Sequence, residues 1–132
     1  MNLTAGQEKL FSEAQRLTQD FIIKRGTFET FALADLGDET LTPLQTTNEF
    51  QSAQDAVGGI LATLIPLSQQ NSLQSVVIST PMNEGTSAVV FDIDHRTDGR
   101  VLVFQPYRKK LFGGWAFGQV ESKIVESRLF AP

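Results

Sequence analysis

Apolar residues near the start of the chain recur every three or four positions, which is the period of an amphipathic helix. Thr4 and Gln7 stand three residues apart just before this pattern and form a capping box. The pattern predicts a first helix over residues 4–20, in a helical segment that Gly26 ends. Its buried face carries Leu10, Ala14, Leu17 and Phe21.

The helical period breaks after this segment, and two short β-type runs follow. Residues 28–35 suit a strand, and the turn sequence at 37–39 suits a reversal. A second short strand is expected to end near Leu44, and Pro43 marks it as an edge strand. These features predict a β-hairpin.

A second helix is predicted over residues 48–65, where a broad apolar stripe returns at helical spacing. Thr46 and Glu49 form a second capping box, and Pro66 is expected to end the helix. The pair at residues 58–59 is glycine, which weakens a helix, so we interpret it as allowing close approach to a sheet.

Four further apolar runs are typical of strands, and short turn sequences separate them. They predict an antiparallel meander, with residues 121–132 left as either a strand or a tail. The fold class is therefore α+β: a central antiparallel sheet of five to six strands with two main helices, in the order helix, two strands, helix, three or four strands. The four runs are residues 73–80, 86–94, 99–107 and 115–120.

Composition supports one folded domain over residues 1–132, because 41% of residues are hydrophobic, 20% are charged and only five are proline. The chain has no cysteine, which excludes disulfides, thiolate metal sites and cysteine nucleophiles. Its start lacks a basic segment followed by a long apolar run, and no apolar stretch approaches the ~20 residues of a membrane span. We therefore expect a cytoplasmic protein with no membrane partner.

Charge is distributed unevenly along the chain, although the net charge is only −4. Residues 1–94 carry four Lys/Arg and twelve Asp/Glu, whereas residues 95–132 carry seven and three. Opposite charges can attract a partner or a second copy, but in one domain they can also interleave and cancel. The sequence leaves both possibilities open.

The run VVFDID resembles the strand of haloacid-dehalogenase phosphatases, in which the first aspartate attacks phosphorus and the second acts as the general acid. Two features argue against Asp92 as a nucleophile. Arg96 stands where that family has a small residue, and the 38 residues after Asp94 are too few for the further parallel units. We expect both aspartates on the polar face of a strand, with Arg100 as an exposed cross-strand ion partner.

The element order resembles the profilin-like layout of Roadblock and longin domains, and that resemblance implies helices that mediate dimerisation or scaffold assembly. The segments FALADL, DIDHRTDG and QPYR are similar to small stand-alone bacterial domains of unassigned function. That similarity implies no mechanism.

Aromatic and basic residues meet in QPYRKKLFGGWAF, a mixture that single-stranded nucleic acid favours. The acidic pI of about 4.9 argues against nucleic acid, so we interpret this segment as a solvated turn between two strands. Phe28 and Trp115 are candidates for an exposed apolar patch among the ten phenylalanines and the tryptophan.

The sequence yields two functional hypotheses and shows no catalytic, metal or cofactor constellation. The first is a non-catalytic protein-interaction or scaffold domain that forms a homodimer or binds another protein. The second is a small anionic-ligand binding or enzymatic domain whose pocket lies near the only histidine. The candidate ligand-binding residues of that pocket are His95, Arg96, Tyr107 and Arg108.

Overall fold

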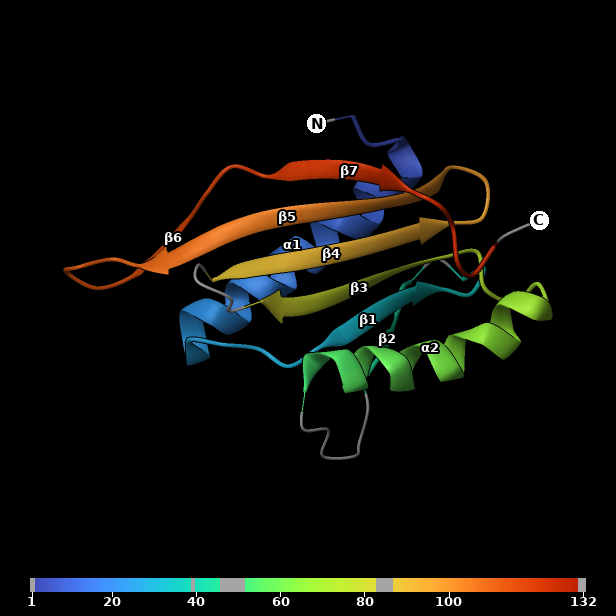
Figure 1. Cartoon of the computed structure of the whole chain (residues 1–132), viewed down its shortest axis with the longest axis horizontal. Coiled ribbons are helices and arrows are strands. Elements are labelled where there is room, and N and C mark those ends of the chain that lie inside the picture. Colours follow the sequence, from blue (N-terminus) through green and yellow to red (C-terminus); the bar gives the residue numbers. More distant parts are fainter. Residues whose placement is uncertain (1, 39, 46–51, 83–86, 131–132) are drawn as a thin grey trace.

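An antiparallel sheet with one helix on each face forms the architecture in a computed structural model (Figure 1). The structure describes residues 2–38, 40–45, 52–82 and 87–130. The helices are α1 (Ala5–Arg25) and α2 (Ala53–Gln69), and the strands are β1 (Phe31–Asp35), β2 (Thr42–Leu44), β3 (Ser75–Met82), β4 (Ala88–His95), β5 (Gly99–Lys109), β6 (Trp115–Phe117) and β7 (Glu121–Val125). The α+β class with a central antiparallel sheet is confirmed.

The strands lie in the order β2-β1-β3-β4-β5-β6, and β7 also pairs with β5. Both β6 and β7 lie along β5, since β6 pairs with residues 107–109 and β7 with residues 100–104. The seven strands therefore form a sheet six strands wide, and the segment left open at 121–132 begins with a strand.

Alternation along the strands divides the apolar residues between two cores. The α1 core contains Phe91 of β4, whose ring meets that of Phe11 edge-on at 5.2 Å. The α2 core contains Val76 and Ile78 of β3 under Ile60 of the helix. Each helix therefore buries one face of the same central strands.

Helix α1 begins and ends with the predicted signals. The Thr4 hydroxyl accepts from the Gln7 N–H, the Gln7 side chain accepts from the Thr4 N–H, and Gly26 ends the helix with a φ of 79°. The helix runs to Arg25 and is longer than predicted, because Ile22 continues its buried face against the sheet.

Helix α2 begins after Ser52, whose side chain caps it. The capping box proposed for residues 46 and 49 lies outside the described residues, and the end of the helix differs from its prediction. The helix continues through Pro66 to Gln69, and at its end the Gln70 N–H donates to the Pro66 carbonyl while the Arg96 side chain donates to the Ser68 carbonyl. Of the helices that the structure describes, none is long and apolar enough to cross a membrane.

Gly58 lies on the exposed side of α2, and a Cβ added there meets no atom of the described residues within 4 Å. The interpretation that this glycine allows close approach to the sheet is therefore wrong.

We expect Gly58→Ala to raise the free energy of unfolding by about 0.5–1 kcal/mol, because alanine loses less backbone entropy in a helix. Urea unfolding followed by far-UV circular dichroism measures the change.

Gly118→Ala is the matched substitution with the opposite expected sign. A Cβ at Gly118 would lie 2.7 Å from Cγ of Pro106 in β5. The backbone at Gly118 or the Pro106 ring must therefore shift, at a cost of about 1–3 kcal/mol. Equal changes in the two variants would contradict this account of the two glycines.

Candidate functional site

The two aspartates of β4 bind the carboxyl-terminal segment of the described chain. Asp94 is 2% exposed, and its carboxylate accepts from the Ser127 hydroxyl at 2.8 Å and from the Arg128 and Leu129 N–H groups at 3.1 Å. Leu129 then packs against the α2 core. Asp94 lies on the strand face opposite Phe91 and Ile93, as expected, but it is buried because this segment covers it.

Asp92 forms the predicted ion pair with Arg100, which donates through Nε at 2.8 Å and through Nη2 at 2.9 Å. Arg128 binds the same carboxylate. The hydrogen bonds that Arg100 donates to the Asp92 carboxylate raise the pKa of Arg100. The side chains of Asp92 and Arg100 are largely covered instead of exposed as expected. Through Arg128 the Asp92 carboxylate also joins the sheet to the final segment.

The four candidate ligand-binding residues lie at two ends of the sheet. His95 pairs with Gly99 at the start of β5, whereas Tyr107 and Arg108 lie near its end, beside β6. Arg108 lies nine positions after Gly99 along β5, which is about 30 Å at the usual rise per residue. One small ligand cannot contact all four, so the structure does not form the expected shared pocket.

His95 stabilises the turn between β4 and β5. Its Nδ1 accepts from the N–H groups of Thr97 and Asp98 at 3.3 and 3.1 Å, an arrangement that assigns the proton to Nε2 in the neutral ring. The ring packs so closely on α1 that a Cβ at Gly6 would lie 2.6 Å from Nε2.

The Arg96 side chain binds the end of α2 and the residues that follow it. Its guanidinium donates to the carbonyl oxygens of Leu73 and Ser68 and to the Asn71 side chain. Its other contact is the ring of Phe130, whose centroid lies 4.7 Å away. A cation at this position also suits the negative end of the helix dipole.

No group of three or more His, Cys, Asp or Glu side chains within the described ranges is placed to hold a metal ion. Two of the acidic residues serve separate turns: the Asp35 carboxylate accepts from the Gly37 N–H, and the Asp98 carboxylate accepts from the Thr4 hydroxyl.

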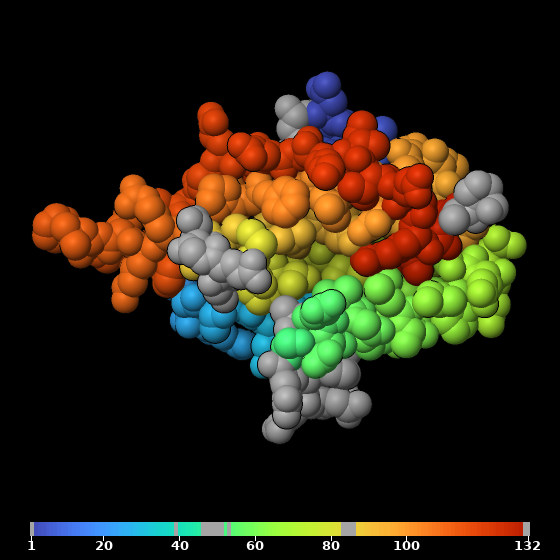
Figure 2. All heavy atoms as spheres, in the orientation of Figure 1, coloured from blue at the N-terminus to red at the C-terminus, as the bar shows by residue number. Residues whose placement is uncertain are grey.

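The hairpin between β5 and β6 carries the two most exposed large apolar side chains of the described residues. Leu111 is 89% exposed and Phe112 is 96% exposed, and the hairpin projects from the body in Figures 1 and 2. Gly113 and Gly114 have φ of 93° and 82°, which suit glycine and close the turn. The turn thus holds two large apolar side chains in solvent, away from either core.

The base of this hairpin is fixed to the body. Tyr107 is buried, and its ring centroid lies 6.0 Å from that of Trp115 and 6.4 Å from that of Phe117. Trp115 packs beside Gly26 at the end of α1. Phe28, expected in an exposed patch, is buried against Phe31 instead, and Trp115 is partly buried.

Cations gather on the same hairpin. Arg108, Lys109 and Lys110 are exposed and directly precede the apolar tip. Residues 99–120 contain four Lys/Arg and no Asp/Glu, so the hairpin is positive within a chain of net charge −4.

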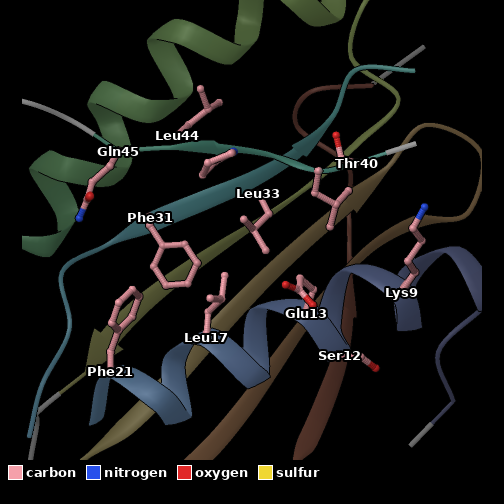
Figure 3. Close-up of a pocket in the computed structure, with 12 residues that line it drawn as sticks. Lys9, Ser12, Glu13, Leu17, Phe21, Phe31, Leu33, Thr40, Leu44 and Gln45 are labelled. Atoms are coloured by element: carbon pink, nitrogen blue, oxygen red, sulfur yellow. The ribbon is translucent and has the colours of Figure 1, made fainter. Parts of the chain in front are cut away.

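An open groove of about 970 Å³ lies between α1 and the β1–β2 edge of the sheet (Figure 3). It exists because α1 packs mainly on β3 and β4 and leaves this edge partly uncovered. Its walls are apolar, with a few polar side chains between them. The apolar lining residues are Leu17, Phe21, Phe31, Leu33, Leu41, Pro43 and Leu44, and the polar ones are Lys9, Ser12, Glu13, Thr40 and Gln45.

Sequence reasoning did not identify the tip or the groove as candidate sites. Leu111 and Phe112 stand beside two glycines in a turn of the sequence. Because turns are normally polar, two large apolar residues there indicate an exposed apolar site. Leu17 and Phe21 match the helical apolar stripe, which does not distinguish a core position from a groove wall.

Comparisons with protein-family models, with curated proteins and with solved structures found no match. The resemblances to profilin-like domains and to small bacterial domains stay predictions.

We expect Asp94→Ala to lower the free energy of unfolding by about 1–3 kcal/mol, because it leaves a hydroxyl and two N–H groups without their acceptor. Hydrogen exchange at the Arg128 and Leu129 amides should become faster than in the native chain. Asp35→Ala is the control, since Asp35 accepts from one exposed turn amide. Unchanged exchange at both amides would show that Asp94 does not hold the segment.

The pKa of Asp98 is lowered mainly by the Thr4 hydroxyl, which donates to it at 2.6 Å, and further by His95 and Thr97. A lowered folded-state pKa stabilises the protein above the unfolded value of about 3.9 and loses this effect as the pH falls through the folded-state pKa. Asp98→Asn should therefore reduce stability at neutral pH and flatten its dependence on pH below about 4.

Chemical unfolding at a series of acidic pH values measures this effect. Asp38→Asn removes a carboxylate from the exposed turn after β1 and serves as the control. Identical acid profiles for native protein and Asp98→Asn would contradict the assignment.

Proposed function

We propose that this chain is a non-catalytic protein-interaction domain that self-associates through the β5–β6 hairpin. One observation carries the proposal: Leu111 and Phe112 are almost fully exposed at the tip of a hairpin whose base is fixed to the core. Exposed apolar residues on a projecting, well-anchored element are typical of a docking surface, because their burial against a partner is favourable.

The surroundings of the tip support binding to a protein surface. The fixed base reduces the conformational entropy that the hairpin loses on binding, and aromatic tips are frequent anchors of protein interfaces. The cations beside the tip favour a receiving surface with negative charge at its edge.

The alternative function, binding of a small anionic ligand near His95, has less support. Arg96 already donates to the end of α2, and Arg108 lies at the other end of β5. His95 uses Nδ1 within its own turn.

Light scattering over a dilution series tests the proposal. We expect the native chain to change from monomer to a larger species as concentration rises, and Leu111→Ser/Phe112→Ser to remain a monomer of unchanged stability. The association constant of the variant should fall by at least about tenfold for each exposed side chain removed, as for interface anchors.

Ile124→Ser is the matched control, because Ile124 is also a highly exposed apolar residue but lies on β7. It should associate like the native chain. A native chain that stays monomeric throughout, or a hairpin variant that associates normally, would overturn the proposal.

A further inference from the structure

We infer that the hairpin tip of one copy inserts into the α1–β2 groove of a second copy. This inference rests on the proposed function and names the surface that receives the hairpin. The receiving surface is the groove lined by Leu17, Phe31, Leu33 and Leu41 (Figure 3).

The tip and the groove match in size and polarity. At about 970 Å³ the groove is comparable in size to sites that enclose whole small ligands, so it accommodates two side chains. Leucine and phenylalanine at the tip would replace water over leucine and phenylalanine in the groove, and the hydrophobic effect favours that exchange.

Charge also favours a second copy as the occupant. Residues 1–45, which include the groove lining, carry seven Asp/Glu and four Lys/Arg, whereas the cations Arg108, Lys109 and Lys110 directly precede the hairpin tip. The lining itself holds one cation, Lys9, and one anion, Glu13, which pairs with Arg16, so the favourable charge is that of the whole segment. Opposite charges on the two surfaces raise the association rate and orient the approach.

The area required for stable binding favours a reciprocal dimer. One Leu–Phe tip and the groove surface that it covers bury on the order of 600 Å² together. Specific interfaces bury about 1,200–2,000 Å², so a single contact is too small. Two-fold exchange forms two equal contacts and reaches about 1,200 Å², which predicts a closed dimer instead of an open chain.

Groove variants test the inference by light scattering. Leu41→Lys and Leu17→Lys place a cation on opposite walls of the groove, and each should weaken dimerisation at least about tenfold. Both positions are partly exposed, and the lysine stem can cover the wall while its charge reaches solvent. Ile23→Lys makes the same type of change at an exposed site of α1 outside the groove lining and should leave the dimer intact.

Cross-linking locates the contact directly, because the chain has no cysteine of its own. Lys110→Cys marks the hairpin and Thr40→Cys marks the groove rim, and both positions are exposed. We mix the two single variants, each tested first for native-like dimerisation, and add a short bismaleimide. The expected product is a mixed cross-linked pair, and each variant alone should give much less linked product.

The outcomes separate this inference from the proposed function. One result would overturn the groove as the receiving surface and keep the hairpin as the docking element: the dimer is lost in the hairpin variant but retained in both groove variants. Cross-links between two hairpin tips only would have the same meaning. A native chain that is monomeric at every concentration would overturn both.

Discussion

The pairing of β4 with β5 determines where the exposed hairpin tip of this molecule lies. The register sets His95 opposite Gly99 and Ala88 opposite Pro106, so β5, with eleven residues, continues past the end of β4, which has eight. Among the described strands, β6 alone pairs with that extension, and the turn that joins them projects beyond the sheet. The exposed tip is therefore a consequence of unequal strand lengths in the register that the turn at residues 96–98 sets.

The same pairing organises the opposite end and the second face of the sheet. The β4–β5 turn is tied to the start of α1 through Thr4, Gln7 and Asp98, so the helix and the turn stabilise each other. On the second face, Asp92 and Asp94 bind the segment that follows β7. A pair of acids that resembles a phosphatase motif in sequence thus acts in packing and hydrogen bonding.

Local signals predicted the fold well because they depend on few neighbours. The capping box at Thr4, the left-handed Gly26 and the apolar runs of β3 to β5 each act within one element, and the structure contains all three. The end of α2 was not predictable in this way. The last turn of the helix binds Arg96, which is 30 positions from Pro66 in the chain and reaches the helix only in the folded protein.

The candidate site was harder to predict for the same reason. Sequence placed residues of β4 and β5 in one pocket, but strand length separates Arg96 from Arg108 along the sheet. The groove depends on how far α1 leaves the β2 edge uncovered. The spacing of apolar residues predicts which face of α1 is buried, but not where the helix lies on the sheet. Burial of Phe28 and exposure of Phe112 likewise follow from tertiary position, since both are phenylalanines near strand ends.

A hairpin tip bound in the groove of a second copy brings protons of two chains within a few ångströms of each other. Isotope-filtered nuclear Overhauser spectroscopy on a mixture of labelled and unlabelled chains detects such contacts. We expect them between the Phe112 ring of one chain and the methyl groups of Leu17, Leu33 or Leu41 of the other. Intermolecular contacts confined to the two Phe112 rings, or none involving Phe112, would contradict this expectation.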